Sequence, residues 1–312
     1  MKKIAFIIPY FGNELPAYFE PFLITCEGNP TIDFFIFTDD KRKFIDSKNV
    51  FFIYCTWKEM KEKVQKCFDF IVSLDSPYKL CDYRPAYGEI FADYLGAYDF
   101  WGHCDIDLIW GDIRKFIPDS LLERYDRIGT NGSFTLYRNA DVVNTYYRCL
   151  PCKNNMYYKD VYTTHDLKAF DEVAEHNGGG MTCILEDNGV KVASNPGRWS
   201  TIDYKCSCFR TPYYKEFVIH YQKGKLFTEK KGKKMEELPY FHYHLRKKAA
   251  IVESCSEDFY LVSPCVFTNE TGSKKKHYMK RINWKLYWIG RDIRIFLGAY
   301  KRKAINFISR KR

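Results

Sequence analysis

Two aspartates separated by one residue, Asp105 and Asp107, stand between two apolar runs, residues 99–104 and 108–110. Carboxylates flanked by so many apolar residues are seldom idle, because burying an unpartnered charge is unfavourable. Carboxylate oxygens suit Mg²⁺ or Mn²⁺, which proteins commonly hold with one or two such groups plus substrate phosphates. The pair therefore predicts a site for Mn²⁺ or Mg²⁺, whose role would be to neutralise a departing diphosphate.

A second polar cluster, with Asp82 and Arg84, lies at the start of an expected helix, residues 82–98. A helix N-terminus favours anions. Arg84 is a candidate partner for phosphate, and Asp82 is a candidate acceptor of hydrogen bonds from sugar hydroxyls. The alternative is purely structural, with Asp82 capping the helix and Arg84 forming a salt bridge.

Strands alternating with helices would position these residues. The apolar runs predict strands at residues 4–8, 31–37, 50–54 and 99–104, later strands at 126–130 and 133–137, and helices at 58–68 and 82–98. Such alternation implies an α/β fold with a mainly parallel sheet covered on both faces. Ligands of such sheets bind at the carboxyl ends of the strands.

Polar residues follow three of these predicted strands. Pro9 and Tyr10 end the first, Thr38 and Asp39 end the second, and Asp105 follows the fourth. Because parallel strands end at the same edge of a sheet, we expect one site assembled from three strand ends.

The stretch from Asp82 to Asp107 resembles the Asp-x-x-Arg and Asp-x-Asp arrangement of GT-A glycosyltransferases, the class with the glycosyltransferase-32 enzymes and the large clostridial toxins. The spacing here is Asp-x-Arg. A closer likeness is to a bacterial group of uncharacterised GT-A-like proteins found with capsule and lipopolysaccharide genes. It covers about residues 1–250 and rests on four segments: Ile8 to Gly12, Phe34 to Asp40, Tyr78 to Gly88 and Asp99 to Asp107.

The resemblance implies roles for late residues as well. GT-A enzymes often add a late histidine to the metal shell and a late lysine to the diphosphate site, and His244 and Lys247 are similar to that element. An imidazole suits Mn²⁺ better than Mg²⁺. His242 is the rival ligand, two positions earlier on the same strand face, and the alternative to both is a pair of surface histidines.

The resemblance also places Asp171 and Glu172 beside the sugar. One of these carboxylates would orient the acceptor hydroxyl or act as its base. An acid pair that simply favours a helix dipole is the alternative. By the same resemblance, Thr38 and Asp39 would lie near the nucleotide base or ribose, and Tyr10 would stack on the base.

Basic residues are concentrated at the end of the chain. The formal charge is +10 overall, but residues 274–312 alone carry +13, so the preceding 273 residues carry −3. Apolar residues recur at helical spacing from Ile282 to Tyr300, and such a basic amphipathic helix indicates binding to an anionic membrane surface. The alternatives are a helix packed on the main domain and a nucleic-acid arm, although we expect no nucleic-acid partner.

No signal segment is visible, and the 12 cysteines are interpreted as reduced. We therefore predict a cytoplasmic protein, peripheral on the inner face of a bacterial cytoplasmic membrane. The expected organisation is a GT-A domain at residues 1–250 and a basic helical extension at residues 251–312.

The predicted activity is transfer of a hexose-type sugar from a nucleoside diphosphate sugar, with UDP favoured, to a cell-surface glycan or lipid-linked acceptor. A nucleotidyltransferase is the enzymatic alternative, but residues 9–13 are not the glycine-rich basic loop that such enzymes usually carry. A non-enzymatic membrane- or nucleic-acid-binding protein is the other alternative, and it leaves Asp105 and Asp107 without a role.

Overall fold

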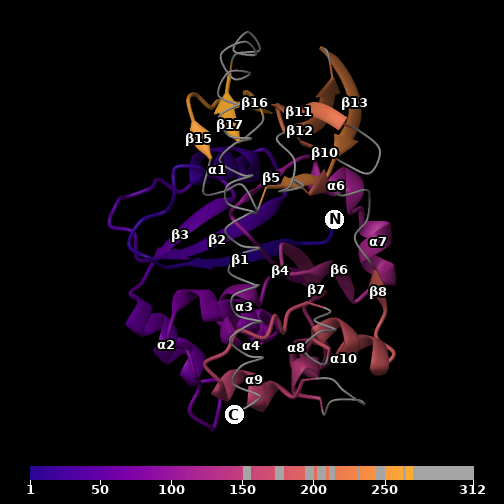
Figure 1. Ribbon diagram of the computed structural model, residues 1–312. Helices are drawn as coiled ribbons and strands as arrows, with labels where there is room; N and C mark the ends of the chain where they lie inside the picture. Colours follow the sequence, from indigo (N-terminus) through magenta and orange to yellow (C-terminus); the bar gives the residue numbers. More distant parts are fainter. Residues whose placement is uncertain are drawn as a thin grey trace, which may run out of the picture.

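The computed structural model describes residues 1–149, 156–172, 179–193, 200–201, 209–210, 215–230, 232–243, 250–262 and 265–269. At its centre lies a seven-stranded sheet with the order β3-β2-β1-β4-β7-β6-β8 (Figure 1). The strands are β1 (Ile4–Tyr10), β2 (Ile32–Thr38), β3 (Val50–Tyr54), β4 (Phe100–Cys104), β6 (Arg127–Asn131), β7 (Phe134–Arg138) and β8 (Val192–Ala193). Only β7 runs against its neighbours, so the expected α/β fold with a mainly parallel sheet and flanking helices is confirmed.

Helices cover both faces of this sheet, and β1 shows why. Its apolar side chains alternate, with Ala5 and Ile7 in one core and Ile4, Phe6 and Ile8 in the other. A strand that is apolar on both faces must be buried on both. The first face carries α2 (Trp57–Gln65), α3 (Leu80–Tyr83), α4 (Tyr87–Ile90), α5 (Ala92–Leu95), α8 (Asp141–Thr145), α9 (Tyr158–Thr163) and α10 (Met181–Asp187), and the second carries α1 (Phe19–Glu27), α6 (Ile113–Phe116) and α7 (Asp119–Arg124).

The helix predicted over residues 82–98 is instead a chain of short turns. The segment begins earlier, with the 3₁₀ turn η1 (Pro77–Lys79) and α3, and continues through η2 (Arg84–Ala86), α4 and α5. Pro85 lies within η2 and has no N–H to donate, so a continuous α-helix cannot pass through it undisturbed. The interruption places Arg84 at a turn rather than on the face of a long helix.

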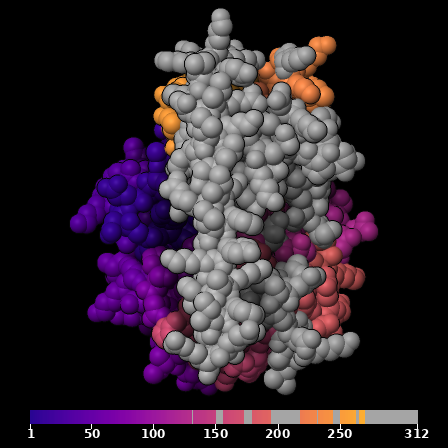
Figure 2. Space-filling model, in the orientation of Figure 1, coloured from indigo at the N-terminus to yellow at the C-terminus, as the bar shows by residue number. Residues whose placement is uncertain are grey.

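A second, largely antiparallel sheet follows in the sequence. It comprises β10 (Phe209–Arg210), β11 (Lys215–Gln222), β12 (Lys225–Lys230), β13 (Lys233–Leu238), β15 (Ile251–Val252), β16 (Asp258–Val262) and β17 (Val266–Thr268). Its β11–β12 pair is an antiparallel hairpin that turns at Lys223. It packs on α1, where the Tyr221 hydroxyl donates to the Ile24 carbonyl at 3.5 Å. In Figure 2 its yellow strands lie directly above the indigo N-terminal part.

The start of the predicted extension belongs to this sheet. We expected residues 251–312 to be helical, but β16 pairs with β11 across the predicted boundary. Alternation in Asp258–Val262 explains the difference, because Phe259 and Leu261 are buried in the same core as Ile219. The basic segment at residues 274–312 lies outside the described residues.

A third, small sheet joins the two larger ones. In it β14 (Tyr240–His242) runs between β5 (Leu108–Trp110) and β9 (Ser200–Thr201). Its register places His242 opposite Leu108, the residue after Asp107. None of the described helices is long and apolar enough to cross a membrane, and none of the described cysteines forms a disulfide.

Candidate active site

The carboxyl ends of β1 and β4 border a cavity of about 340 Å³. Pro9 and Tyr10 from β1 line it, together with Asp105 and Asp107 after β4, so two of the three strand ends that we expected at one site meet here. The turn at η1 and α3 supplies the opposite wall. The cavity is also lined by Ile7, Tyr18, Tyr78, Leu80, Cys81, Arg84, Tyr87 and His103.

Asp105, Asp107 and His242 form a cluster of possible metal ligands, with one atom from each lying within 4.8 Å of the others. His242 Nε2 is 3.2 Å from Asp107 Oδ1 and 3.6 Å from Asp105 Oδ2. Bonds of about 2.1 Å at right angles would put two ligand atoms about 3.0 Å apart, so these separations fit one small octahedral cation. Two carboxylates and an imidazole suit Mn²⁺ somewhat better than Mg²⁺.

Backbone pairing explains why His242 reaches the aspartates. β14 lies antiparallel to β5, and the Tyr243 N–H donates to the Asp107 carbonyl at 3.0 Å. On the other side, the Asp105 N–H donates to the Ser133 carbonyl at 3.0 Å. The bend that carries both carboxylates is therefore held by backbone hydrogen bonds at each end. His242, our rival ligand, is the histidine found here, while His244 and Lys247 lie outside the described residues.

Arg84 connects this cluster to the predicted catalytic acids. Its Nη2 bonds Asp105 Oδ1, and its Nη1 bonds Asp171 Oδ2 at 2.9 Å and the Gly132 carbonyl at 2.6 Å. Arg84 therefore forms the salt bridges that we had weighed as its structural role, and it orients Asp105 while leaving Oδ2 of that residue toward His242.

Asp171 and Glu172 differ in their surroundings. Asp171 is buried and paired with Arg84, and its burial, partly offset by Arg84, raises its pKa to about 6. Glu172 is exposed, and its Oε1 accepts a hydrogen bond from the Gly132 N–H at 3.2 Å. Gly132 is the tight point of this arrangement, because a Cβ there would meet Asp171 Oδ2 and Glu172 Oε1 at 2.7 Å. Gly132 lies between the strands predicted at residues 126–130 and 133–137, and we had predicted no role for it in the site.

The structure does not bring Asp82 into the cavity. Asp82 is fully buried, and its carboxylate accepts hydrogen bonds from Lys79 Nζ at 2.8 Å and from the Phe170 N–H at 3.0 Å. It also accepts from the Lys168 N–H at 3.0 Å. The predicted sugar contact is therefore wrong in position, because backbone donors of the segment just before Asp171 use these oxygens.

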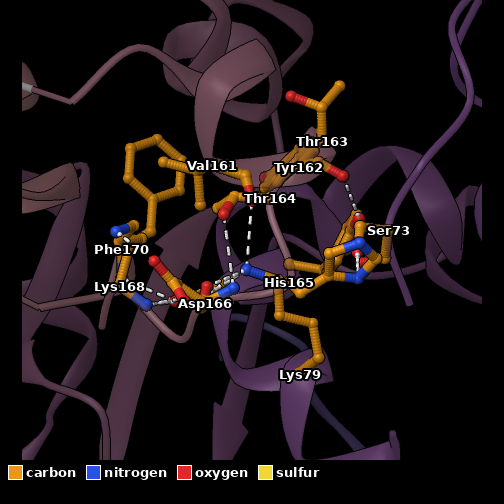
Figure 3. A network of polar contacts seen from close by, with 12 residues as sticks. Ser73, Lys79, Val161, Tyr162, Thr163, Thr164, His165, Asp166, Lys168 and Phe170 are labelled. Carbon is orange, nitrogen blue, oxygen red and sulfur yellow. Dashed lines mark hydrogen bonds and ion pairs between the residues drawn. The ribbon is translucent and has the colours of Figure 1, made fainter. Parts of the chain in front are cut away.

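Lys79 completes the anchoring of that segment. Its ammonium group also donates to the Val161 carbonyl at 3.0 Å and bonds the Asp166 carbonyl (Figure 3). All three donor positions of the ammonium are thus used, and residues 161–170 are held against α3 at the base of the site. Figure 3 also shows Ser73 against His165, where one ring nitrogen meets both Ser73 and Asp75, so these three residues do not form a Ser-His-Asp triad.

Thr38 and Asp39 likewise do not line the cavity. Thr38 is buried, and its hydroxyl accepts a hydrogen bond from the Asp40 N–H at 3.2 Å. Asp39 Oδ1 accepts from the N–H groups of Gly12 and Asn13 at 3.0 and 3.1 Å. The side chain therefore ties the end of β2 to the loop after β1, and a nucleotide contact at Thr38 and Asp39 stays a prediction.

His103 lines the cavity, although the sequence analysis did not predict it as a site residue. His103 on β4 is buried, and burial together with the charges of Arg84 and Arg127 lowers its pKa well below the usual value for histidine. The ring is therefore neutral at pH 7. Its position two residues before Asp105, on the same side of the strand, was the available signal.

Comparison with known proteins gives remote structural likenesses. The chain is similar to galactosyltransferase LgtC in complex with donor and acceptor sugar analogs, with 13% identity, 64% of this chain and 76% of that chain covered, and a TM-score of 0.38. It is also similar to mouse xyloside xylosyltransferase 1 in its apo form, with 9% identity, 64% of this chain and 87% of that chain covered, and a TM-score of 0.38. A third likeness is to the apo-form glycosyltransferase GlyE of Streptococcus pneumoniae TIGR4, with 12% identity, 46% of this chain and 35% of that chain covered, and a TM-score of 0.28.

Likenesses at these scores carry no inference about what this chain binds. None of the curated proteins compared matches it. A family model matches residues 6–271, most of the chain and all of the site described above. On that match the chain belongs to the family described as a family of unknown function (DUF6625).

Proposed function

We propose that this protein is a metal-dependent glycosyltransferase that moves a sugar from a nucleoside diphosphate sugar, with UDP as the nucleotide, to a cell-surface glycan or lipid-linked acceptor. The observation that carries the proposal is the convergence of Asp105, Asp107 and His242 on one point of a cavity at the strand ends. Three ligands of this kind leave positions on a cation for the oxygens of a diphosphate.

Mn²⁺ or Mg²⁺ held by these three residues would supply Lewis-acid stabilisation of the diphosphate as it leaves. The protein's own contribution is positioning. Arg84 fixes Asp105 by a charge-assisted hydrogen bond, so that one carboxylate oxygen stays directed at His242. Pro9 and Tyr10 border the cavity where a base would stack, and we assign Lys247 to the diphosphate and keep His244 as an alternative ligand.

Asp171 and Glu172, which lie between α9 and α10, receive different roles in this proposal. Glu172 is the exposed carboxylate, so we assign it to the acceptor hydroxyl, which it would orient or deprotonate. Asp171 is buried against Arg84 and acts as a positioning residue. A catalytic base must reach its substrate, and burial with an ion-pair partner leaves Asp171 less able to do so than Glu172.

We further propose that residues 274–312 attach the enzyme to an anionic membrane surface. The support is the sequence, with a net charge of +13 and apolar residues at helical spacing. Each basic group near such a surface contributes about 1 kcal/mol, so a fraction of these residues is sufficient for peripheral attachment. Attachment to the inner face of a cytoplasmic membrane would place the cavity beside a lipid-linked acceptor.

A panel of nucleotide sugars tests the activity. We expect the full chain to hydrolyse one UDP-sugar slowly with Mn²⁺ and not with EDTA, and Asp107→Asn to abolish that hydrolysis. Absence of turnover across UDP-, GDP-, CMP- and dTDP-sugars, with and without a glycan acceptor, would contradict the proposal. Comparing His242→Ala with His244→Ala then identifies the ligand, since disturbing a metal site lowers metal affinity by roughly 10–100-fold.

A further inference from the structure

His103 stands out because it is a buried polar side chain without a partner. It is 1% exposed, and neither ring nitrogen makes a hydrogen bond to any described residue. The Gly132 backbone lies near the ring but outside hydrogen-bonding geometry, and its carbonyl already accepts from Arg84. A buried polar group left unpaired is unfavourable and calls for an explanation.

The ring forms part of the cavity wall, at the closed end. His103, Tyr87, Leu80 and Ile7 all line the cavity and are all buried, whereas Tyr78 on the opposite side is 61% exposed. The His103 ring contacts aromatic rings edge-on and tilted, with centroids 6.3 Å from both Tyr87 and Tyr137. Both ring nitrogens are covered in this structure, and rotation about the broad Cβ–Cγ torsion is the motion that would turn one of them toward a bound ligand.

Among the cations near this closed end, Arg84 lines the cavity and Arg127 does not. Arg84 is paired with both Asp105 and Asp171, so its positive charge is compensated before any ligand binds. An imidazole can donate through one ring nitrogen and accept through the other, and a hydroxyl satisfies both together, whereas a phosphate oxygen accepts only. The closed end therefore suits an uncharged hydroxyl-bearing group better than a diphosphate.

We propose that His103 is a specificity-determining residue that hydrogen-bonds a hydroxyl of the transferred sugar at the closed end of the cavity. The inference rests on the proposed function, because it needs a nucleotide sugar whose diphosphate occupies the Asp105, Asp107 and His242 cluster. Ile7, Leu80 and Tyr87 at the closed end belong to the core on the α3 side of the sheet, and they line the same cavity as Asp105 and Asp107. A site built to bond a hydroxyl rejects ligands that lack it, because its own polar group is then unpaired.

Calorimetry with Mn²⁺ separates this role from nucleotide binding. The ligands are UDP, UDP-glucose, UDP-galactose and UDP-N-acetylglucosamine, and the proteins are wild type, His103→Phe and His103→Gln. We expect His103→Phe to lower the affinity for the tightest-binding UDP-sugar by about 10-fold, which is the effect of losing one buried hydrogen bond. The affinity for UDP should be unchanged. His103→Gln keeps a donor and an acceptor and should recover most of the loss.

Tyr137→Phe is the matched control, because the Tyr137 hydroxyl is buried in the same aromatic cluster but does not line the cavity. It should bind every ligand as the wild type does, and thermal unfolding verifies that each variant is folded. Equal weakening of UDP and UDP-sugar in His103→Phe, or no weakening of either, would overturn the sugar contact. A wild-type protein that binds no UDP would instead overturn the proposed function, and with it this inference.

Discussion

Replacing Asp82 tests whether the buried anchor beneath the site is structural. The Asp82 side chain has no exposed surface, that of Lys79 is 4% exposed, and their charged atoms are 2.8 Å apart. In Asp82→Ala the ammonium loses the carboxylate that pairs with it, and the N–H groups of Lys168 and Phe170 lose their acceptor. Nothing in the described surroundings replaces that carboxylate.

The expected loss is large. Removing one partner of a buried ion pair costs about 3–5 kcal/mol, against a total stability of about 5–15 kcal/mol for a typical domain. Asp93→Ala is the matched control, because Asp93 and Lys63 are also 2.8 Å apart but Asp93 is 59% exposed. An exposed pair of this kind contributes about 0–1 kcal/mol. Because the two separations are equal, a difference in stability between the variants reflects burial and the two backbone hydrogen bonds that Asp82 accepts.

Urea unfolding followed by circular dichroism measures both variants. The double variant Lys79→Met/Asp82→Ala should lose less than the sum of its single variants, because each single change leaves a buried group unpaired. If Asp82→Ala is no less stable than Asp93→Ala, the anchoring role is refuted. If the double variant loses the full sum, the two side chains act independently and the ion-pair reasoning fails.

Three further predictions concern the site and the tail. Gly132→Ala should reduce Mn²⁺-dependent UDP-sugar turnover at least 10-fold in a coupled assay while the protein stays folded, because the new Cβ collides with Asp171 and Glu172. The raised pKa of Asp171, about 6 against an ordinary 3.8, favours folding at low pH, and this contribution is lost as pH rises from about 4 to 6. Between pH 4 and pH 6 the free energy of unfolding of Asp171→Asn should therefore rise by up to about 3 kcal/mol relative to that of the wild type, as measured by urea unfolding at each pH. A chain ending at Gly272 should lose salt-sensitive sedimentation with anionic liposomes, and equal binding by both chains would contradict the membrane role.

The first four strands of the central sheet were predictable because each is a run of mainly apolar residues that must be buried. β1, β2, β3 and β4 lie within one or two residues of the predicted segments. Asp105 and Asp107 follow β4 with no local use for their side chains that the sequence shows, so their place in the cavity could be foreseen.

The misplaced residues share one cause, which is competition from nearby backbone donors. Asp39 and Asp82 were predicted to face a ligand, but both carboxylates accept from N–H groups of neighbouring loops. Such loops approach only in the folded chain, and no spacing rule reveals them. The second sheet was missed for a similar reason, since β11 pairs with β16 across nearly forty residues. His103 was missed because residues 99–104 were interpreted only as a buried strand, and the spacing of two residues between His103 and Asp105 was not used.

Metal-dependent binding of UDP tests the central claim most directly. Calorimetry should detect UDP binding to the full chain with Mn²⁺ and none with EDTA. Asp107→Asn should weaken that binding more than 10-fold, since it removes a direct ligand, whereas Asp93→Asn, an exposed carboxylate outside the cavity, should leave it unchanged. Binding of UDP that is equal with Mn²⁺ and with EDTA, or equal in wild type and Asp107→Asn, would contradict the metal site and the transferase proposed from it.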